Sequence, residues 1–311
     1  MDRIHNAAAS LRGLALGDSF GQRWFFRRGN ERDEQLHNRV TPDESPWYWT
    51  DDTAMALSVV RILHLHGHVD QDALADHFAG AYMADPNRGY GPSMHGVLRA
   101  IHEGADWREV TAAQFEGMGS WGNGSAMRVA PLGAWFADDL DVVADQAERS
   151  AEASHAHPEA AAGAIAVAVA AALATTGRDA PAPAPGEFLT AVADRTPYSE
   201  VRGGLRKAAE LPEGSSVRLA VTVLGSGQRI SCPDTVPFAL WTAAWHQDDL
   251  VDALWTTASG QGDIDTTCAI TGGVVACRTG LGAVPDAWLA ATEALPDWVD
   301  TGSRGRGTHA P

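Results

Sequence analysis

The sequence predicts an all-α protein whose helices pack as a single compact, orthogonal multi-helix domain. Apolar residues recur mainly with the period of a helix, and the chain is rich in alanine. Alternating strand patterns are scarce, and the one decent candidate, at 217–224, suits a helix equally well. Hydrophobic residues make up 45% of the 311 residues and charged residues 20%, so a large buried core is expected.

Each expected helix is marked by helical spacing of apolar residues or by its alanine and leucine content. The helices are expected over 6–17, 52–66, 70–84, 92–103, 139–153, 158–176, 186–194, 200–210, 235–246, 248–258, 265–279 and 286–294. The polar stretch from Phe26 to Pro46 is expected to be a loop that is either functional or disordered. We expect one domain over 1–300 and a disordered tail over 301–311.

Charge and cysteine content narrow the function classes. The net charge of −17 argues against stable nucleic-acid binding, which needs clustered Lys and Arg. The three cysteines show no metal or disulfide spacing, which favours a reduced, cytoplasmic setting. The apolar run at 160–174 is too short and too weakly hydrophobic to span a bilayer and predicts a packed internal helix. We expect a soluble monomer with no membrane partner.

Two acidic clusters stand directly before apolar helical runs, at 50–53 (Thr-Asp-Asp-Thr) and at 262–267 (Gly-Asp-Ile-Asp-Thr-Thr). Either cluster alone is explained by helix capping, although a cap needs one such residue rather than four in a row. Four converging carboxylates would repel one another unless some were protonated or two divalent cations balanced them. Carboxylate and hydroxyl oxygens suit Mg²⁺, Mn²⁺ or Ca²⁺ rather than Zn²⁺. A joint two-metal site is the stronger hypothesis.

Three further segments offer ligand-binding groups. Residues 122–125 (Gly-Asn-Gly-Ser) form either a simple tight turn or a loop whose N–H groups cradle a phosphate. Residues 154–159 contain a His-X-His pattern that lacks a third zinc ligand, so a helix cap or a hydrogen bond to a ligand is the better interpretation. Tyr90, in a turn at 88–92, could supply a stacking face or a hydroxyl. Aromatic residues near these segments, including Trp121, could form the flat apolar slot that an adenine ring needs, or simply core.

Six motifs in this order resemble the ADP-ribosylglycohydrolase family, which includes the dinitrogenase-reductase activating glycohydrolase and the ADP-ribosyl-acceptor hydrolases. They lie at 13–18 (GLALGD), 49–55 (WTDDTAM), 88–91 (RGYG), 122–128 (GNGSAMR), 154–157 (SHAH) and 262–266 (GDIDT). The resemblance runs from about 7 to 285, and the ordered set is far more specific than any one motif.

The resemblance implies an all-α fold of the ADP-ribosylglycohydrolase type, with two Mg²⁺ ions, or Mn²⁺ as a substitute, in a central cleft. It implies an enzyme that cleaves the glycosidic bond between ADP-ribose and an acceptor, which could be a protein side chain, a nucleic acid or a small molecule. Carried over by motif, the metal ligands would be Thr50, Asp51, Asp52, Asp263, Asp265 and Thr266. Catalytic roles would fall to Asp51, Asp52 and Asp263. The ADP-ribose site would be lined by Gly122, Asn123, Gly124 and Ser125, with His157 and Tyr90 nearby.

One departure from the family pattern bears on mechanism. Many relatives carry a glutamate at the place of Phe25, and Glu31 or Glu34 could substitute for it. The aromatic run at 24–26 suggests instead a more hydrophobic lid. Two alternatives therefore stay open: a non-catalytic ADP-ribose-binding or structural relative, as the lens crystallins related to this family exemplify, and a metal phosphoesterase acting on another nucleotide. The acceptor is not determined by the sequence.

Overall fold

The computed structural model describes residues 2–27 and 29–301, and within them every regular element is helical. The elements are α1 (Arg3–Gln22), α2 (Gly29–His37), α3 (Asp51–His66), α4 (Gln71–Ala84), α5 (Pro92–His102), α6 (Trp107–Gly117), η1 (Asn123–Ser125), α7 (Ala130–Trp135), α8 (Leu140–Glu152), α9 (Pro158–Thr176), α10 (Pro185–Arg195), α11 (Glu200–Glu210), α12 (Val217–Leu224), α13 (Cys232–Trp245), α14 (Leu250–Ser259), α15 (Ile264–Thr279), α16 (Asp286–Ala291) and α17 (Trp298–Thr301). The all-α prediction is confirmed, and the ambiguous 217–224 segment is a helix.

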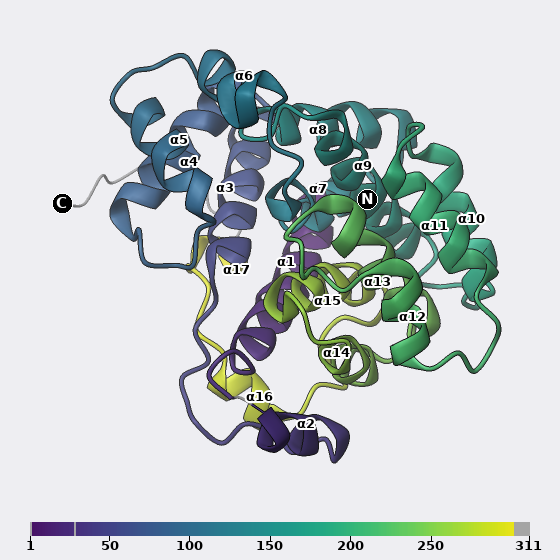
Figure 1. Cartoon of the computed structure of the whole chain (residues 1–311). Coiled ribbons are helices and arrows are strands. Elements are labelled where there is room, and N and C mark those ends of the chain that lie inside the picture. The colour runs from purple at the N-terminus through teal and green to yellow at the C-terminus, as the bar shows by residue number, and fades with distance from the viewer. Residues whose placement is uncertain (1, 28, 302–311) are drawn as a thin grey trace.

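The centre of the fold is the antiparallel pair α1 and α15. Figure 1 shows them side by side, with α3 to α6 on one side and α10 to α14 on the other. Glycines of α1 face α15, and a Cβ at Gly17 would lie 2.1 Å from the Cys268 carbonyl oxygen. A Cβ at Gly21 would lie 2.5 Å from Cα of Asp265. Because no side chains separate the two backbones here, the end of α1 is held against the start of α15.

The alanine-rich helix α9 lies inside the fold. It is long and apolar enough in composition to cross a membrane, but 78% of its most apolar stretch is buried within the protein. Its small side chains pack against α7, α8, α13 and α15. The prediction of a packed internal helix in this segment is confirmed. The expectation that the segment is too short and too weakly hydrophobic to span a bilayer is wrong, because the helix extends over Pro158–Thr176.

The stretch from Phe26 to Pro46 is not wholly a loop, because α2 forms within it. This helix buries only Leu36, so it carries no apolar stripe from which helical spacing could be recognised. Tertiary contacts hold it instead: Arg32 donates to the Gln261 side chain at 2.8 Å, and Gln261 donates to Asp33 at 2.9 Å. Three further helices, α6, α7 and α17, were also absent from the sequence prediction. The predicted disordered tail falls outside the described residues except for Thr301, which ends α17.

Candidate active site

A cavity of about 570 Å³ collects the segments that the sequence singled out. Both acidic clusters, the glycine-rich segment and the turn at 88–92 contribute to its wall. The predicted site residues that line it are Asp51, Asp52, Tyr90, Gly122, Asn123, Gly124, Asp263, Asp265 and Thr266. The cavity therefore joins segments that are far apart in the sequence, between Asp51 and Thr266.

The first acidic cluster is the N-terminus of α3, but its capping comes from another helix. The Thr50 hydroxyl is a distant acceptor for the Asp52 N–H, at 3.4 Å. The carboxylate of Asp18, on α1, accepts from the Thr50 N–H at 2.9 Å and from the Thr53 N–H at 3.1 Å. Since Asp18 satisfies these N–H groups, which have no partner within α3, Asp51 and Asp52 are not needed as caps. Capping alone therefore does not explain this cluster.

The second acidic cluster begins α15 and is fixed from two sides. The Asn123 side chain donates to Asp263 Oδ2 at 2.7 Å, which ties the glycine-rich segment to this cluster. Asp265 Oδ1 accepts from the Thr266 N–H at 2.8 Å. Gly262 has a φ of +74° and lies so close to Ser226 that an added Cβ would be 2.2 Å from the Ser226 carbonyl oxygen. Only glycine fits this turn, which aims both aspartates into the cavity.

The two acidic clusters meet in space. Carboxylate oxygens of Asp18, Asp52 and Asp265 all lie within 4.8 Å of one another. Burial and then the neighbouring Asp18 charge raise the pKa of Asp51 to about 8. Burial and repulsion among the carboxylates also raise the pKa values of Asp52 and Asp265 well above the usual range. The two clusters therefore meet through Asp52 and Asp265, and the site carries more negative charge than it can hold without protons or cations. Binding of metal by all four predicted carboxylates stays a prediction.

Asp52 also has a buried oxygen with nothing to bind. Its Oδ1 is inaccessible to solvent and has no hydrogen-bond partner. Buried polar atoms are almost always paired, and an unpaired one calls for an explanation such as an ion. The surrounding donors are carboxylate and hydroxyl oxygens, which hard divalent cations prefer. The residues present therefore fit a Mg²⁺-type site.

Three predicted site residues are not in the cavity wall: the metal-ligand candidate Thr50 and the ligand-binding candidates Ser125 and His157. His157 is the N-cap of α9, where its Nδ1 accepts from the Glu159 N–H at 3.1 Å. The Ser125 hydroxyl is buried and donates to the Ala160 carbonyl at 2.9 Å. His155 lines the cavity in place of His157. The choice between the two histidines depended on where α9 starts, because Pro158 at its first turn makes the preceding residue the cap.

His155 and the glycine-rich segment fit each other closely. A Cβ on Gly122 would lie 3.1 Å from His155 Nε2, and one on Gly124 would lie 3.0 Å from it. His155 Nδ1 is 2.8 Å from the Ser154 hydroxyl. Burial, with a smaller effect from Arg128, lowers the pKa of His155 to about 3, so the imidazole is neutral near pH 7. The two glycines thus make room for a neutral ring that faces the ligand cavity.

Arg128 forms hydrogen bonds with the glycine-rich segment and with residues just before α9. Its guanidinium donates to the Gly124 carbonyl at 3.0 Å, the Ser150 carbonyl at 2.6 Å and the Ser154 hydroxyl at 2.9 Å. Arg128 is fully buried, and its guanidinium carbon lies 4.5 Å from the centre of the Phe78 ring. Through these hydrogen bonds, Arg128 fixes the position of the glycine-rich segment relative to the Ser154–His155 pair.

The residues considered as replacements for the family glutamate lie elsewhere. Phe25 is 40% exposed and does not line the cavity. Glu31 and Glu34 are exposed on α2, and neither is part of the cavity wall. Asp18 is the buried carboxylate at this site that the sequence interpretation did not assign. Its signal was an aspartate at the end of an otherwise apolar run, Gly13–Gly17.

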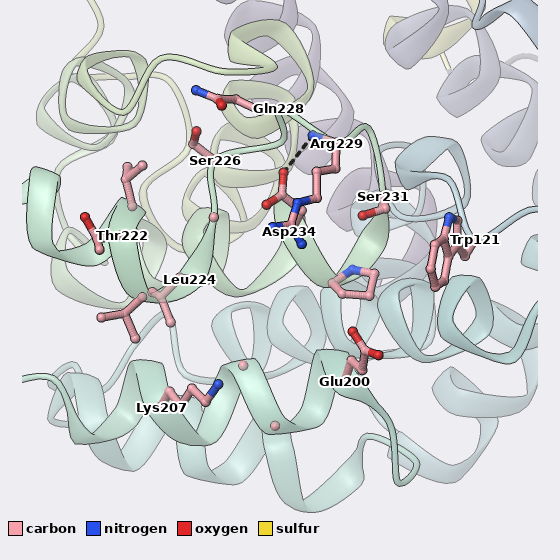
Figure 2. Close-up of a pocket in the computed structure, with 16 residues that line it drawn as sticks. Trp121, Glu200, Lys207, Thr222, Leu224, Ser226, Gln228, Arg229, Ser231 and Asp234 are labelled. Carbon is pink, nitrogen blue, oxygen red and sulfur yellow. Dashed lines mark hydrogen bonds between the residues drawn. The ribbon is translucent and has the colours of Figure 1, made fainter.

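A second cavity, of about 650 Å³, adjoins the first. Figure 2 shows it between α11, α12, the loop at 225–231 and the start of α13, with Trp121 and Arg229 belonging to the walls of both cavities. Asp234 holds the loop by accepting from the Arg229 N–H at 2.8 Å, the dashed line in Figure 2. The other face of the loop supports the second acidic cluster, because the Asp263 N–H donates to the Ser226 carbonyl at 3.0 Å. One loop therefore shapes both cavities.

Comparison with known proteins identifies the family and agrees with the fold. The family model for ADP-ribosylglycohydrolase matches residues 1–306, and the chain belongs to this family. ADP-ribosylhydrolase ARH3 of Homo sapiens is 30% identical over 294 residues, which cover 85% of this chain and 77% of that protein. ADP-ribosylarginine hydrolase Tri1 of Serratia proteamaculans is 24% identical and covers 93% of this chain and 75% of its own.

A solved structure described as an ADP-ribosylglycohydrolase-related protein complex has the same fold. It superposes with a TM-score of 0.64 at 23% sequence identity and covers 96% of this chain and 95% of its own. The family resemblance and the fold type inferred from the six motifs are both confirmed. The curated relatives are named as hydrolases, which places this chain in a hydrolase family.

Proposed function

We propose that the protein is a metal-dependent hydrolase that cleaves the glycosidic bond between ADP-ribose and a modified acceptor and releases ADP-ribose. The observation that carries the proposal is the cluster of Asp52 and Asp265, with its unpaired buried oxygen, in the wall of a cavity of about 570 Å³. Family membership gives the reaction class. The carboxylates give the chemistry that such a reaction needs.

Two Mg²⁺ ions, or Mn²⁺ in their place, would be held by both acidic clusters. The proposed ligands are Thr50, Asp51, Asp52, Asp263, Asp265 and Thr266. When bound, such ions polarise oxygen substituents, stabilise developing charge and lower the pKa of water. The Asn123 side chain keeps Asp263 in place through its 2.7 Å hydrogen bond.

The rest of the cavity suits the remainder of ADP-ribose. The glycine-rich segment enters the short 3₁₀ turn η1, where backbone N–H groups can receive a diphosphate. Phe115 and Trp121 are about half exposed, at 53% and 49%, and both line the cavity, so an adenine ring has aromatic faces to contact. The neutral His155 can donate from Nε2 if Nδ1 accepts from Ser154. Tyr90 completes the wall.

The experiment that tests the function is release of ADP-ribose from a panel of substrates linked through arginine, serine and nucleic acid. We expect release from at least one linkage in the presence of Mg²⁺ and its loss with a chelator, because the ions supply charge stabilisation worth several kcal/mol, or roughly 10³-fold in rate. ADP-ribose binding without turnover on any linkage would favour the non-catalytic alternative. Release of inorganic phosphate would favour the phosphoesterase.

The raised pKa values make a separate prediction about metal binding and pH. Because the folded-state pKa of Asp51 is about 8 against an ordinary value of 3.8, the metal-free folded protein holds protons that the unfolded chain has lost. The cluster's contribution to the free energy of unfolding therefore falls as pH rises through this window. Mg²⁺ needs the deprotonated carboxylates and relieves their repulsion, so its stabilising effect should grow from about pH 5 to about pH 8.

Differential scanning calorimetry with and without Mg²⁺ at the two pH values checks this. Comparing the increase in melting temperature that Mg²⁺ causes removes the effects of carboxylates elsewhere. An increase that is the same at both pH values, or larger at the lower one, would contradict the assignment of the cluster as the ion site.

A further inference from the structure

Asp18 is fully buried on α1, facing the first turn of α3. Its Oδ2 accepts from the Thr50 N–H at 2.9 Å, the Thr53 N–H at 3.1 Å and the Thr53 hydroxyl at 2.6 Å. Its Oδ1 lies 2.9 Å from the Thr50 hydroxyl, which donates to it. Three donors thus converge on Oδ2 and one reaches Oδ1, so both oxygens of Asp18 are already hydrogen-bonded.

Asp18 is nevertheless close enough to the other carboxylates to be taken for a metal ligand. One of its oxygens lies within 4.8 Å of one oxygen each of Asp52 and Asp265. The difference lies in what each carboxylate already binds: both oxygens of Asp18 accept hydrogen bonds from Thr50 and Thr53, whereas Asp52 Oδ1 has no partner. The unpaired oxygen of Asp52 is therefore the one that most needs a cation, and Asp18 is already bound to the start of α3.

The hydrogen bonds of the Thr50 hydroxyl show how Asp18 orients its neighbours. This hydroxyl lies 2.9 Å from Asp18 Oδ1 and 2.8 Å from Asp52 Oδ2, and it has only one proton to donate. With that proton on Asp18, the Thr50 oxygen keeps its lone pairs and Asp52 keeps both oxygens as acceptors. Asp18 thereby orients the two residues of α3 that would bind a cation.

We propose that Asp18 is a positioning residue, which holds Thr50 and the first turn of α3 so that Thr50 and Asp52 present oxygen atoms to the ion site, without itself binding the ion. The inference rests on the metal site of the proposed function. It extends to the second cluster, because Gly17 packs on the Cys268 carbonyl and Gly21 on Asp265 Cα. Through this packing one carboxylate on α1 sets α3 against the start of α15.

The test is Mn²⁺ binding to the full chain without substrate, measured by calorimetry or electron paramagnetic resonance below the unfolding temperature. Asp18→Asn cannot accept from all four donors, and we expect it to bind the same number of ions as the wild type with about 10–100-fold lower affinity, as for other residues that orient ligands. Thr53→Val removes one donor to Asp18 without changing charge or shape, and a smaller loss of affinity is expected.

Ser19→Ala is the matched control. Ser19 is the next residue on α1, and its hydroxyl is buried without a hydrogen-bond partner, so its removal should leave Mn²⁺ affinity unchanged. The Thr53 variant separates positioning from electrostatics, because Asp18→Asn also removes a negative charge near the ions.

Three results would overturn the proposal. Loss of one ion per chain in Asp18→Asn would make Asp18 a ligand. Wild-type affinity in Asp18→Asn, with only a lower melting temperature, would make its role purely structural. Wild-type affinity in Thr53→Val would reduce the effect of Asp18 to its charge. If the wild-type protein binds no Mn²⁺, the metal site fails as well, which is a failure of the proposed function and is recognised as such before any variant is compared.

Discussion

Asp52→Asn is expected to slow ADP-ribose release by roughly 10³-fold and to raise the melting temperature of the metal-free protein. The first effect follows because the variant removes a charged ligand and with it several kcal/mol of charge stabilisation in the reaction. The second follows because Asp52 is only 1% exposed and its carboxylate is repelled by Asp18, Asp265 and Asp51. An amide of the same shape removes that repulsion.

Asp286→Asn is the matched control for this prediction. Asp286 also lies in the first turn of a helix, α16, but it is exposed and outside the cavity. The same change of charge should leave both activity and melting temperature close to those of the wild type. Activity is measured as released ADP-ribose, and stability by thermal unfolding in chelator. Full activity in Asp52→Asn, or a lower metal-free melting temperature, would contradict the assignment of Asp52 as a repelled metal ligand.

Gly17→Ala is expected to lower the free energy of unfolding by about 3 kcal/mol or more, at the upper end of what overpacking costs. The added Cβ would lie 2.1 Å from the Cys268 carbonyl oxygen, and a helix backbone cannot turn away as a side chain can. The α1–α15 contact would have to open, which would also move Asp18 and Asp265 apart. We therefore expect weaker Mg²⁺ binding in whatever fraction of this variant folds.

Gly80→Ala provides the comparison, because Gly80 is also inside a helix, α4, and a Cβ there meets nothing within 4 Å. This variant should gain about 0.5–1 kcal/mol from the better helix propensity of alanine. Urea unfolding of both variants measures the difference. Equal stability of the two would show that the α1–α15 contact is not as close as the structure has it.

Local sequence signals were sufficient for most helices and for singling out the two acidic clusters that line one cavity. Helical spacing and alanine content predicted the helix at 158–176. The four acidic residues beside two helix starts are more than helix capping requires. The same signals could not predict α2, because this helix is polar on nearly all faces. Hydrogen bonds that join Arg32 and Asp33 to Gln261 stabilise it, rather than an apolar stripe of its own. The periodicity of apolar residues indicates which face of a helix is buried. It does not indicate a helix that is stabilised by side chains from distant parts of the sequence.

The glycines of α1 also show the difference between what the sequence indicates and what the tertiary structure adds. Their positions in α1 are visible in the sequence, but their use is to let two backbones touch, which depends on the partner helix. The sequence also does not distinguish the roles of His155 and His157. The turn that leads into α9 places His155 in the cavity wall and makes His157 the N-cap of the helix.

By itself the sequence determined the fold class, the family and the acidic clusters, because periodicity, helix starts and ordered motifs are properties of the chain read in one dimension. Only the tertiary structure decided that Asp18 caps α3 from α1 and that Asp52 has an oxygen left unpaired. The physical reason is that a carboxylate's role depends on which donors reach its lone pairs. Those donors come from helices far apart in the chain that meet only after α1 and α15 have packed.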